Sequence, residues 1–314
     1  MYCIILSQKN DYFCRMDRTE LCCIGHITHD KVVTPRSVVH MAGGTAFYFS
    51  NALSRFDIRY QLVTALAPAD MPSVYDLQSI GIDVTVFPSA HTVFFENIYS
   101  ENQDNRTQRV IRQADAFSAS QLAEIRATVY HLGPLLAGDI PLDLIRSLSE
   151  KGKVSLDAQG YLREVRGQNV FAIDWPWKQQ ALAYVHTLKV NEHEMSVLTG
   201  ESDVHKSAKI LAGWGVKEVV ITLGSMGSVI YAEQAFHTIP AYVPTTSVVD
   251  ATGCGDTYMA GYLYSRVKGA SIREAGEFAA AMATLKIEGS GPFTGTREDV
   301  QALLASRKDK VKQP

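Results

Sequence analysis

The stretch VVDATGCGDTYMAGYL, residues 248–263, sets an acid directly behind three small residues where the chain enters a helix. Backbone N–H groups at the start of a helix lack partners within it, and the helix dipole makes this end positive. A turn at Gly253, Cys254 and Gly255 would let such groups face an anion. Asp256 would weaken that anion site unless its carboxylate acts on a neighbouring atom. The alternative is that Asp256 only caps the helix.

The composition indicates a folded protein that binds a small molecule. The 314 residues are 46% hydrophobic and 20% charged, which is enough to bury a large core. A net charge of -3 without a basic run argues against a nucleic-acid partner. Five cysteines without a C-x-x-C pair favour a reducing compartment, and we expect a cytoplasmic location. We expect no membrane partner, because no apolar run is long enough to cross a bilayer.

Short apolar runs such as residues 21–27 and 60–66 alternate with helical patterns along the chain. This order predicts an α/β fold with a mostly parallel sheet and ligands at the carboxyl ends of its strands. Segments of about 29–41 and 88–115 interrupt the order. They could form a small second sheet that acts as a lid, or an edge hairpin. We expect one domain over residues 20–314 and an extension over 1–19, of which the first 15 residues are dispensable.

The acid behind the glycine turn has a chemical explanation in phosphoryl transfer. There, hydrogen-bond donors stabilise the charge on the moving phosphoryl group, while a carboxylate accepts the proton of the attacking alcohol. The base must then stand next to the anion site. The sequence contains neither a G-x-x-x-x-G-K-[ST] loop nor a G-x-G-x-x-G turn after a strand, so another kind of phosphate site is required.

DATGCGD (250–256) resembles the C-terminal signature of the PfkB, or ribokinase-like, family of carbohydrate and nucleoside kinases. Companion motifs follow in the family's order from Cys22 to Phe293. The resemblance implies a doubly wound αβα core with a small β-sheet lid. It also implies that Asp256 is the catalytic base and that Ala251 to Gly255, including Gly253, Cys254 and Gly255, lie at the anion hole. Asp250 would belong to the structural and nucleotide side of the motif. Lid strands in this family often pair between subunits, so a homodimer through the lid is a hypothesis.

Two further elements resemble the family's donor site. VNEHEMSVLTG (190–200) matches an N-x-x-E element, which implies that Asn191 and Glu194 organise hydrated Mg²⁺. ITLGSMGSVIY (221–231) resembles a strand-turn-strand nucleotide element. Taken alone, these residues could be a helix cap and a hairpin turn. The resemblance implies ATP as the second cofactor and the following nucleotide-binding residues: Thr222, Gly224, Gly227, Thr252 and Gly253.

The N-terminal half resembles the acceptor site of the family. GHITHD (25–30) ends in Asp30, whose carboxylate can accept two hydrogen bonds from a diol. Gly43 and Gly44 match a di-glycine signature. The asparagine that usually follows these glycines is absent, Tyr48 falls near its place, and Asn51 comes later. This departure leaves ribose and fructose in doubt as acceptors.

SLDAQGYLR (155–163) resembles the inositol 3-kinase branch of the family, which implies that Asp157, Gln159 and Arg163 bind a cyclitol. A polyhydroxylated ring needs many donors and acceptors, and these side chains supply both. The sequence therefore predicts an ATP- and Mg²⁺-dependent kinase of a small polyol such as myo-inositol. Fructose, a keto-deoxy sugar acid, ribose or a nucleoside remain alternative acceptors. A non-catalytic sugar sensor is a further alternative, against which the intact Gly255-Asp256 pair argues.

Overall fold

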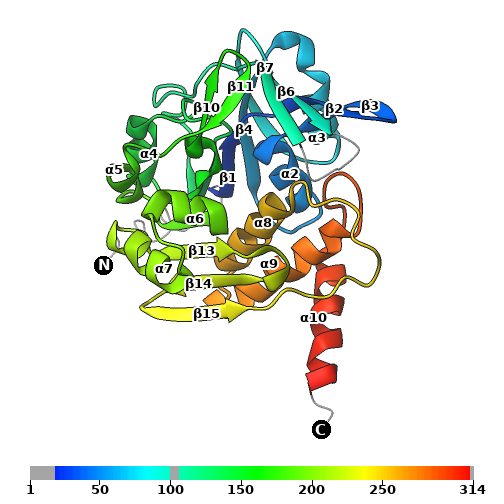
Figure 1. Cartoon of the computed structure of the whole chain (residues 1–314), viewed down its shortest axis with the longest axis vertical. Coiled ribbons are helices and arrows are strands. Elements are labelled where there is room, and N and C mark those ends of the chain that lie inside the picture. The colour runs from blue at the N-terminus through cyan, green and yellow to red at the C-terminus, as the bar shows by residue number, and fades with distance from the viewer. Residues whose placement is uncertain (1–17, 100–105, 312–314) are drawn as a thin grey trace, which may run out of the picture.

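The computed structural model describes residues 18–99 and 106–311, and its centre is a nine-stranded sheet (Figure 1). Neighbouring strands from β13 to β5 run parallel, whereas β14 and β15 are antiparallel additions at one edge. The strands, in spatial order, are β15 (Ala235–Ile239), β14 (Ser228–Ala232), β13 (Glu218–Thr222), β12 (Thr187–Asn191), β9 (Lys153–Asp157), β8 (Ala127–Gly133), β1 (Thr19–Gly25), β4 (Tyr60–Leu66) and β5 (Asp83–Pro88).

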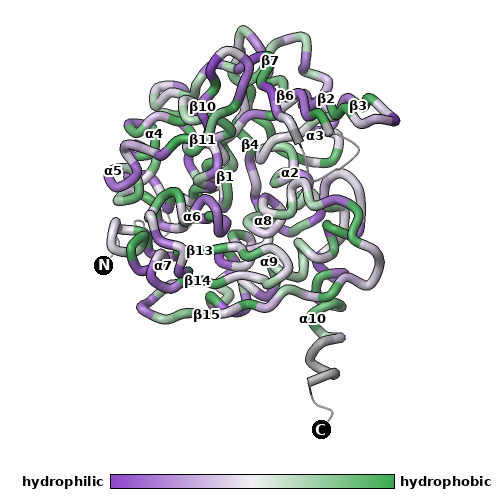
Figure 2. The backbone as a smooth tube through the Cα atoms, viewed as in Figure 1, coloured by the Kyte–Doolittle hydropathy of each residue, from purple (hydrophilic) through white to green (hydrophobic). Residues whose placement is uncertain are grey.

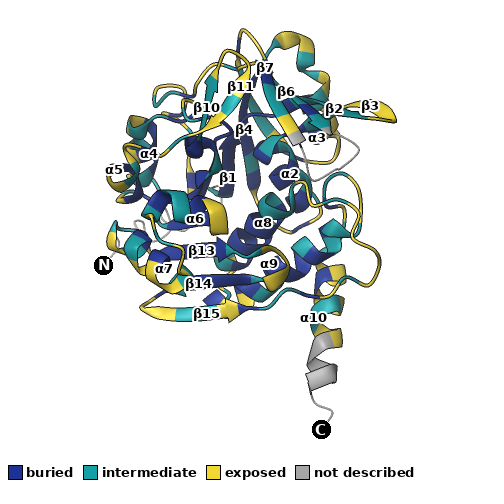
Figure 3. Ribbon diagram, in the orientation of Figure 1, coloured by how far each residue is buried: buried dark blue, intermediate teal, exposed yellow. Residues whose placement is uncertain are grey.

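Helices cover both faces of this sheet, because its strands are apolar on both sides. In β1, Leu21 and Cys23 belong to one hydrophobic core, and Cys22 and Ile24 belong to the other. Figure 2 shows the apolar segments in the interior, and Figure 3 shows β1 and β4 as buried. The first core includes side chains of α2 (Gly44–Leu53), α3 (Pro72–Ser79), α8 (Cys254–Val267), α9 (Ile272–Ile287) and α10 (Arg297–Val311). The second includes α4 (Leu142–Ser149), α5 (Lys178–Leu182), α6 (Glu192–Thr199) and α7 (Val204–Gly213).

A second sheet of six strands, which we call the lid sheet, stands beyond the end of β1 (Figure 1). Its small core consists of Val93, Phe95, Val110, Leu135 and Leu136. The order of its strands is β10 (Arg163–Arg166), β11 (Asn169–Ala172), β7 (Arg106–Arg112), β6 (Val93–Tyr99), β2 (Thr28–Thr34) and β3 (Ser37–Gly43). The predicted α/β fold with a doubly wound sheet and a small lid is confirmed.

The lid sheet is larger than the sequence predicts. Strands β2 and β3 lie in the segment 29–41 or at its ends, and β6 and β7 lie in the segment 88–115. Strands β10 and β11 come from residues 163–172, which the sequence analysis leaves out of the lid. The prediction about residues 1–15 falls outside the described residues. Within the described part of the chain, no helix has the length and apolar character needed to cross a membrane.

Candidate active site

The candidate site forms where the carboxyl ends of the core strands meet the first turns of α2 and α8. Strands β9, β12 and β13 end at Asp157, Asn191 and Thr222. The parallel register sets Lys189 opposite Asp157 and Asn191 opposite Thr222. Residues that lie far apart in the sequence are therefore side by side at one edge of the sheet.

The loop before α8 and the first residues of that helix, 250–256, present backbone donors, and we call this segment the anion-binding loop. Gly253 has φ 75, a left-handed conformation that favours glycine, and α8 begins at Cys254. The N–H group of Cys254 donates to the carbonyl of Ala251 at 3.1 Å. Within the described residues, the N–H groups of Gly253, Gly255 and Asp256 have no protein acceptor. Three donors at the positive end of a 14-residue helix could bind an anion.

Asp256 lies in the first turn of α8 and has the character of a base. Burial and the negative charge of Asp157 raise its pKa to about 6, against the opposing effect of Lys189. Thr45, at the start of α2, provides a side-chain hydrogen bond to this carboxylate. A carboxyl group with this pKa is mostly ionised at pH 7, yet it takes up a proton more readily than an ordinary carboxylate.

Lys189 is the charged residue at the centre of the site that the sequence analysis missed. Its Nζ lies 2.9 Å from Oδ2 of Asp157, and both side chains are buried. Burial lowers the pKa of Lys189, but Asp157 and Glu194 outweigh this effect and hold it above its usual range. A β-carbon added at Gly255 would lie 3.2 Å from this ammonium. The sequence did contain a signal for Lys189, which stands within an apolar strand. A buried charge requires a partner, so such a lysine predicts a nearby acid.

The ion pair with Lys189 gives Asp157 a different part in the site from the one that the sequence predicts. Its second oxygen, Oδ1, accepts the backbone N–H of Gln159 at 3.0 Å. Both oxygens of this predicted acceptor ligand therefore have partners in the protein. The carboxylate orients Lys189 and the turn that carries Gln159 and Arg163.

Asn191 and Glu194 form a complete capping box at the start of α6. Oδ1 of Asn191 accepts the Glu194 N–H, and the two Glu194 oxygens accept the backbone N–H and Nδ2 of Asn191, each at 2.8 Å. Both residues line a cavity of about 370 Å³ together with Gln159, Arg163 and His193. No cluster of three or more acidic, His or Cys side chains that could hold a metal occurs among the described residues.

The start of α2 meets Asp30 at the acceptor side of the site. A β-carbon on Gly43 would lie 2.6 Å from Oδ2 of Asp30 and 2.8 Å from Oγ1 of Thr28. The absence of a side chain at Gly43 therefore leaves room for these oxygens. The Thr28 hydroxyl is buried without a hydrogen-bond partner among the described residues, and the sequence analysis did not select it. Gly44 has φ 83, and a β-carbon there would approach the His26 carbonyl to 2.5 Å.

Asn51 is not brought to this cluster. Its Nδ2 donates to the Phe47 carbonyl of its own helix at 2.9 Å. It follows Gly44 by seven residues, which is about 10 Å along a helix axis. Tyr48 is closer to the site, because a β-carbon on Gly253 would lie 2.2 Å from its ring. Burial and the charges of Asp250 and Asp30 raise the pKa of Tyr48.

Of the residues predicted to bind a nucleotide, Thr222 ends β13, Gly224 and Gly227 belong to the turn before β14, and Thr252 and Gly253 lie in the loop before α8. Oγ1 of Thr222 donates to the Val190 carbonyl at 3.4 Å, next to Asn191. Gly227 has φ 94, and its missing β-carbon would lie 2.1 Å from the Ile239 carbonyl, so the hairpin itself requires this glycine. Burial raises the pKa of Cys254 to about 11, so this side chain is a neutral thiol at neutral pH.

A carboxylate beside backbone amides that lack acceptors among the described residues, under a lid sheet, fits the class of enzymes that transfer a phosphoryl group to an alcohol. A family model described as pfkB family carbohydrate kinase matches residues 97–298. The chain therefore belongs to the pfkB family of carbohydrate kinases. The family predicted from DATGCGD is confirmed.

Three known proteins show the range of this family. A solved pyrophosphate-dependent kinase in the ribokinase family, in complex with a pyrophosphate analogue and myo-inositol, is 30% identical and has a TM-score of 0.80 over 90% of this chain and 99% of its own. The cytidine kinase of Thermococcus kodakarensis is 27% identical over 266 residues, 81% of this chain and 91% of its own. Arabidopsis thaliana ribokinase, solved with ribose and ATP, is 21% identical with a TM-score of 0.76 over 91% of this chain and 99% of its own.

Proposed function

We propose that this kinase phosphorylates a hydroxyl group of a small polyol, with a cyclitol such as myo-inositol as the acceptor and ATP as the donor. The observation that carries the proposal is the position of Asp256. Its carboxylate has a raised pKa and follows directly after amides that have no acceptor in the part of the chain that the structure describes. An acceptor hydroxyl next to Asp256 would lose its proton to this carboxylate, while the N–H groups of Gly253 and Gly255 stabilise the charge on the transferred group.

The acceptor would lie between Asp30 and Asp256, beneath the lid sheet. Asp30 and Thr28 supply oxygens around Gly43, and Gln159 and Arg163 line the cavity of about 370 Å³. Such a ring of acceptors and donors suits a molecule with hydroxyl groups on every side. The 30% identity to a kinase solved with myo-inositol supports a cyclitol.

ATP is the proposed donor, and pyrophosphate is the second candidate. Pyrophosphate is favoured by the 30% identical kinase, which is pyrophosphate-dependent. ATP is supported by the loop before Asp250, which exposes Val243, Val248 and Val249. Apolar side chains beside an anion site suit a nucleobase, whereas pyrophosphate would leave them uncovered.

Mg²⁺ would bind the donor phosphates and neutralise their charge. Asn191 and Glu194 fit contacts to magnesium-bound water, because they line the cavity and a carboxylate retains acceptor capacity after two hydrogen bonds. Their capping box keeps both side chains in fixed positions. The cytoplasmic location and the homodimer through the lid sheet stay predictions.

A nucleoside is the second candidate acceptor. The observation in its favour is the 27% identity to a cytidine kinase over most of both chains. Both reactions would use the same base and the same amides. The two candidates differ only in the group that occupies the space beneath the lid sheet.

The test is a product assay with ATP or pyrophosphate, Mg²⁺ and single acceptors: myo-inositol, other cyclitols, fructose, ribose, 2-keto-3-deoxygluconate and cytidine. Asp256→Asn should lower turnover by about 10² to 10⁴ without raising the donor KM. Its melting temperature should be no lower than that of the wild type at neutral pH, because the raised pKa of Asp256 means that folding disfavours its ionised form, which the amide replaces. The exposed Asp57 gives the matched control, and Asp57→Asn should keep full activity.

The outcomes separate the alternatives. Transfer to myo-inositol that Asp256→Asn abolishes supports both the acceptor and the base. Transfer to cytidine keeps the base and replaces the cyclitol. Near-normal turnover of Asp256→Asn refutes the role of the carboxylate. Tight binding of one acceptor without transfer from either donor would indicate a sugar sensor.

A further inference from the structure

Lys286 is a buried cation to which the proposed reaction gives no role. It lies in the last turn of α9, in a helix of small and apolar residues. Only 2% of its surface is exposed, although lysine is almost never fully buried without a partner. An ammonium group in this position needs a compensating group, and the structure provides one in the loop that precedes α8.

The partner of Lys286 is Asp250, the first residue of DATGCGD. Nζ of Lys286 donates to the backbone carbonyl of Asp250 at 2.7 Å and lies 3.5 Å from its Oδ2. Two backbone hydrogen bonds reinforce this contact. The N–H groups of Val249 and Asp250 donate to the Ile287 carbonyl at 2.9 and 3.4 Å. The end of α9 thus fixes the start of the anion-binding loop.

The contact continues into the loop. Oδ1 of Asp250 accepts the N–H of Thr252 at 2.9 Å, immediately before Gly253. Burial raises the pKa of Asp250, but this hydrogen bond and the charge of Lys286 outweigh burial and lower it overall. The charge of Lys286 also reaches Cys254, whose pKa it lowers against the larger effect of burial. These contacts connect Lys286 through Asp250 with the N–H group of Thr252, the residue directly before Gly253.

We propose that Lys286 is a positioning residue for phosphoryl transfer, with its buried ammonium holding Asp250 so that the loop amides face the transferred group. The inference rests on the proposed function of that loop. Lys286 also supplies a fixed positive charge behind the anion-binding amides. Preorganised charge of this kind stabilises a transition state without a cost of reorganisation during the reaction.

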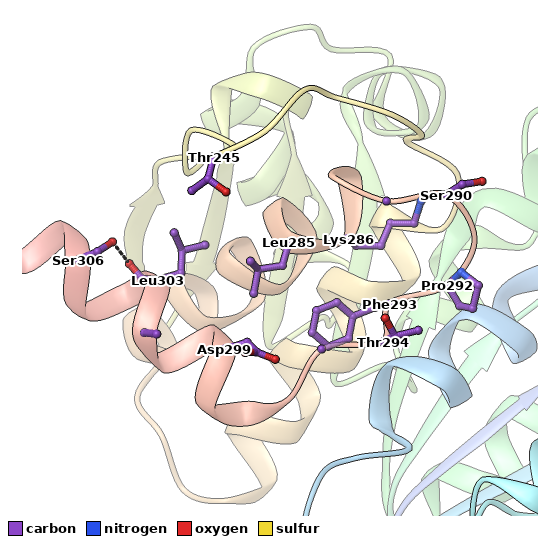
Figure 4. Close-up of a pocket in the computed structure, with 13 residues that line it drawn as sticks. Thr245, Leu285, Lys286, Ser290, Pro292, Phe293, Thr294, Asp299, Leu303 and Ser306 are labelled. Atoms are coloured by element: carbon purple, nitrogen blue, oxygen red, sulfur yellow. Dashed lines mark hydrogen bonds between the residues drawn. The ribbon is translucent and has the colours of Figure 1, made fainter.

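A cavity beside Lys286 makes the inference testable by chemical rescue. It measures about 600 Å³ and lies between α9, α10 and the segment 289–295. Figure 4 shows the Lys286 side chain extending from α9 toward the segment that carries Ser290, with Leu285 and Phe293 nearby. In Lys286→Ala, a small amine such as ethylammonium could enter from this cavity and replace the missing ammonium.

The experiment compares Lys286→Met, Lys286→Arg and Lys286→Ala with the wild type. Lys268→Met is the matched control, because Lys268 follows α8 and pairs with Glu20 on the surface. We expect Lys286→Met to lower kcat by about 10², the effect of losing one preorganised donor to the transition state. The acceptor KM should stay within about twofold of the wild-type value. Lys286→Arg should retain more activity than Lys286→Met. Ethylammonium should raise kcat of Lys286→Ala at least about tenfold and leave Lys268→Met unchanged.

A second readout does not depend on transfer. The dissociation constant of inorganic phosphate, measured by calorimetry, should rise in Lys286→Met and fall again when ethylammonium is added to Lys286→Ala. If the wild type transfers to no acceptor, this measurement alone decides: weaker phosphate binding in Lys286→Met supports the inference, and an unchanged constant overturns it. Ethylammonium that restores only the melting temperature, and neither kcat nor phosphate binding, would show a purely structural role and overturn it. An unchanged kcat in folded Lys286→Met would also overturn the inference.

Discussion

The protonation state of Asp256 should set the lower pH limit of the reaction. Burial raises the pKa of this carboxyl to about 6, and only the ionised form can accept a proton from the acceptor. The value of kcat/KM should therefore be constant above pH 7 and fall about tenfold for each pH unit below 6. The measurement is kcat/KM from pH 5 to 8.5 with saturating donor. A flat profile down to pH 5 would remove Asp256 from the rate-limiting proton transfer.

Some residues of the candidate site follow from a local sequence pattern, and others depend on contacts between distant segments. Asp256, Gly253 and Gly255 could be predicted, because a turn, a helix start and an acid follow one another within seven residues. The position of Thr28 and the pairing of Lys189 with Asp157 could not, because they depend on β2 meeting α2 and on β12 meeting β9. Lys189 itself left a signal only as a lysine within an apolar strand. Asn51 shows the opposite case, since it is close to the di-glycine in sequence but lies two turns along the helix.

At the scale of elements, α2 joins the acceptor side to the anion-binding loop. Gly43 has φ -153, which any residue can adopt, so Gly43→Ala would introduce no backbone strain. Its new β-carbon would lie 2.6 Å from Oδ2 of Asp30 and displace this carboxylate. We expect the acceptor KM to rise at least about tenfold with the donor KM unchanged, which corresponds to the loss of one charged hydrogen bond.

The control for this change is Gly138→Ala, because Gly138 is exposed and a β-carbon there would meet nothing within 4 Å. Initial rates with varied acceptor and varied donor provide both KM values for each variant. An acceptor KM in Gly43→Ala equal to that of Gly138→Ala would mean that Asp30 does not bind the acceptor.

Elements with a long periodic pattern could be predicted, and short ones could not. The segments 29–41 and 88–115, which contain most of β2, β3, β6 and β7, were visible because they interrupt the βα order, and a second sheet was one of two interpretations of them. Strands β10 and β11 have four residues each, which is too short for a period to be read. Their place in the lid sheet depends on the pairing of Asn169 with Arg109, a contact across 60 positions that no local pattern contains.

At the scale of the whole molecule, the two sheets differ in how firmly they are held. The core sheet packs between two large hydrophobic cores, whereas the small core of the lid sheet has five buried side chains. Local opening should therefore cost less free energy in the lid sheet. An acceptor held between the sheets would stabilise the closed arrangement, because it binds that arrangement better.

Hydrogen exchange measures this difference directly. Without ligand, amides of β6 and β7 should exchange faster than those of β1 and β8. Acceptor at 100 times its dissociation constant should slow the β6 and β7 amides by up to about 100-fold, the limit for a ligand that binds only the closed form. The amides of α4, whose buried side chains belong to the second hydrophobic core, provide the internal reference and should change little. If bound acceptor raises the melting temperature but leaves β6 and β7 unchanged, the six-stranded sheet does not cover the acceptor, and binding is confined to the ends of the core strands.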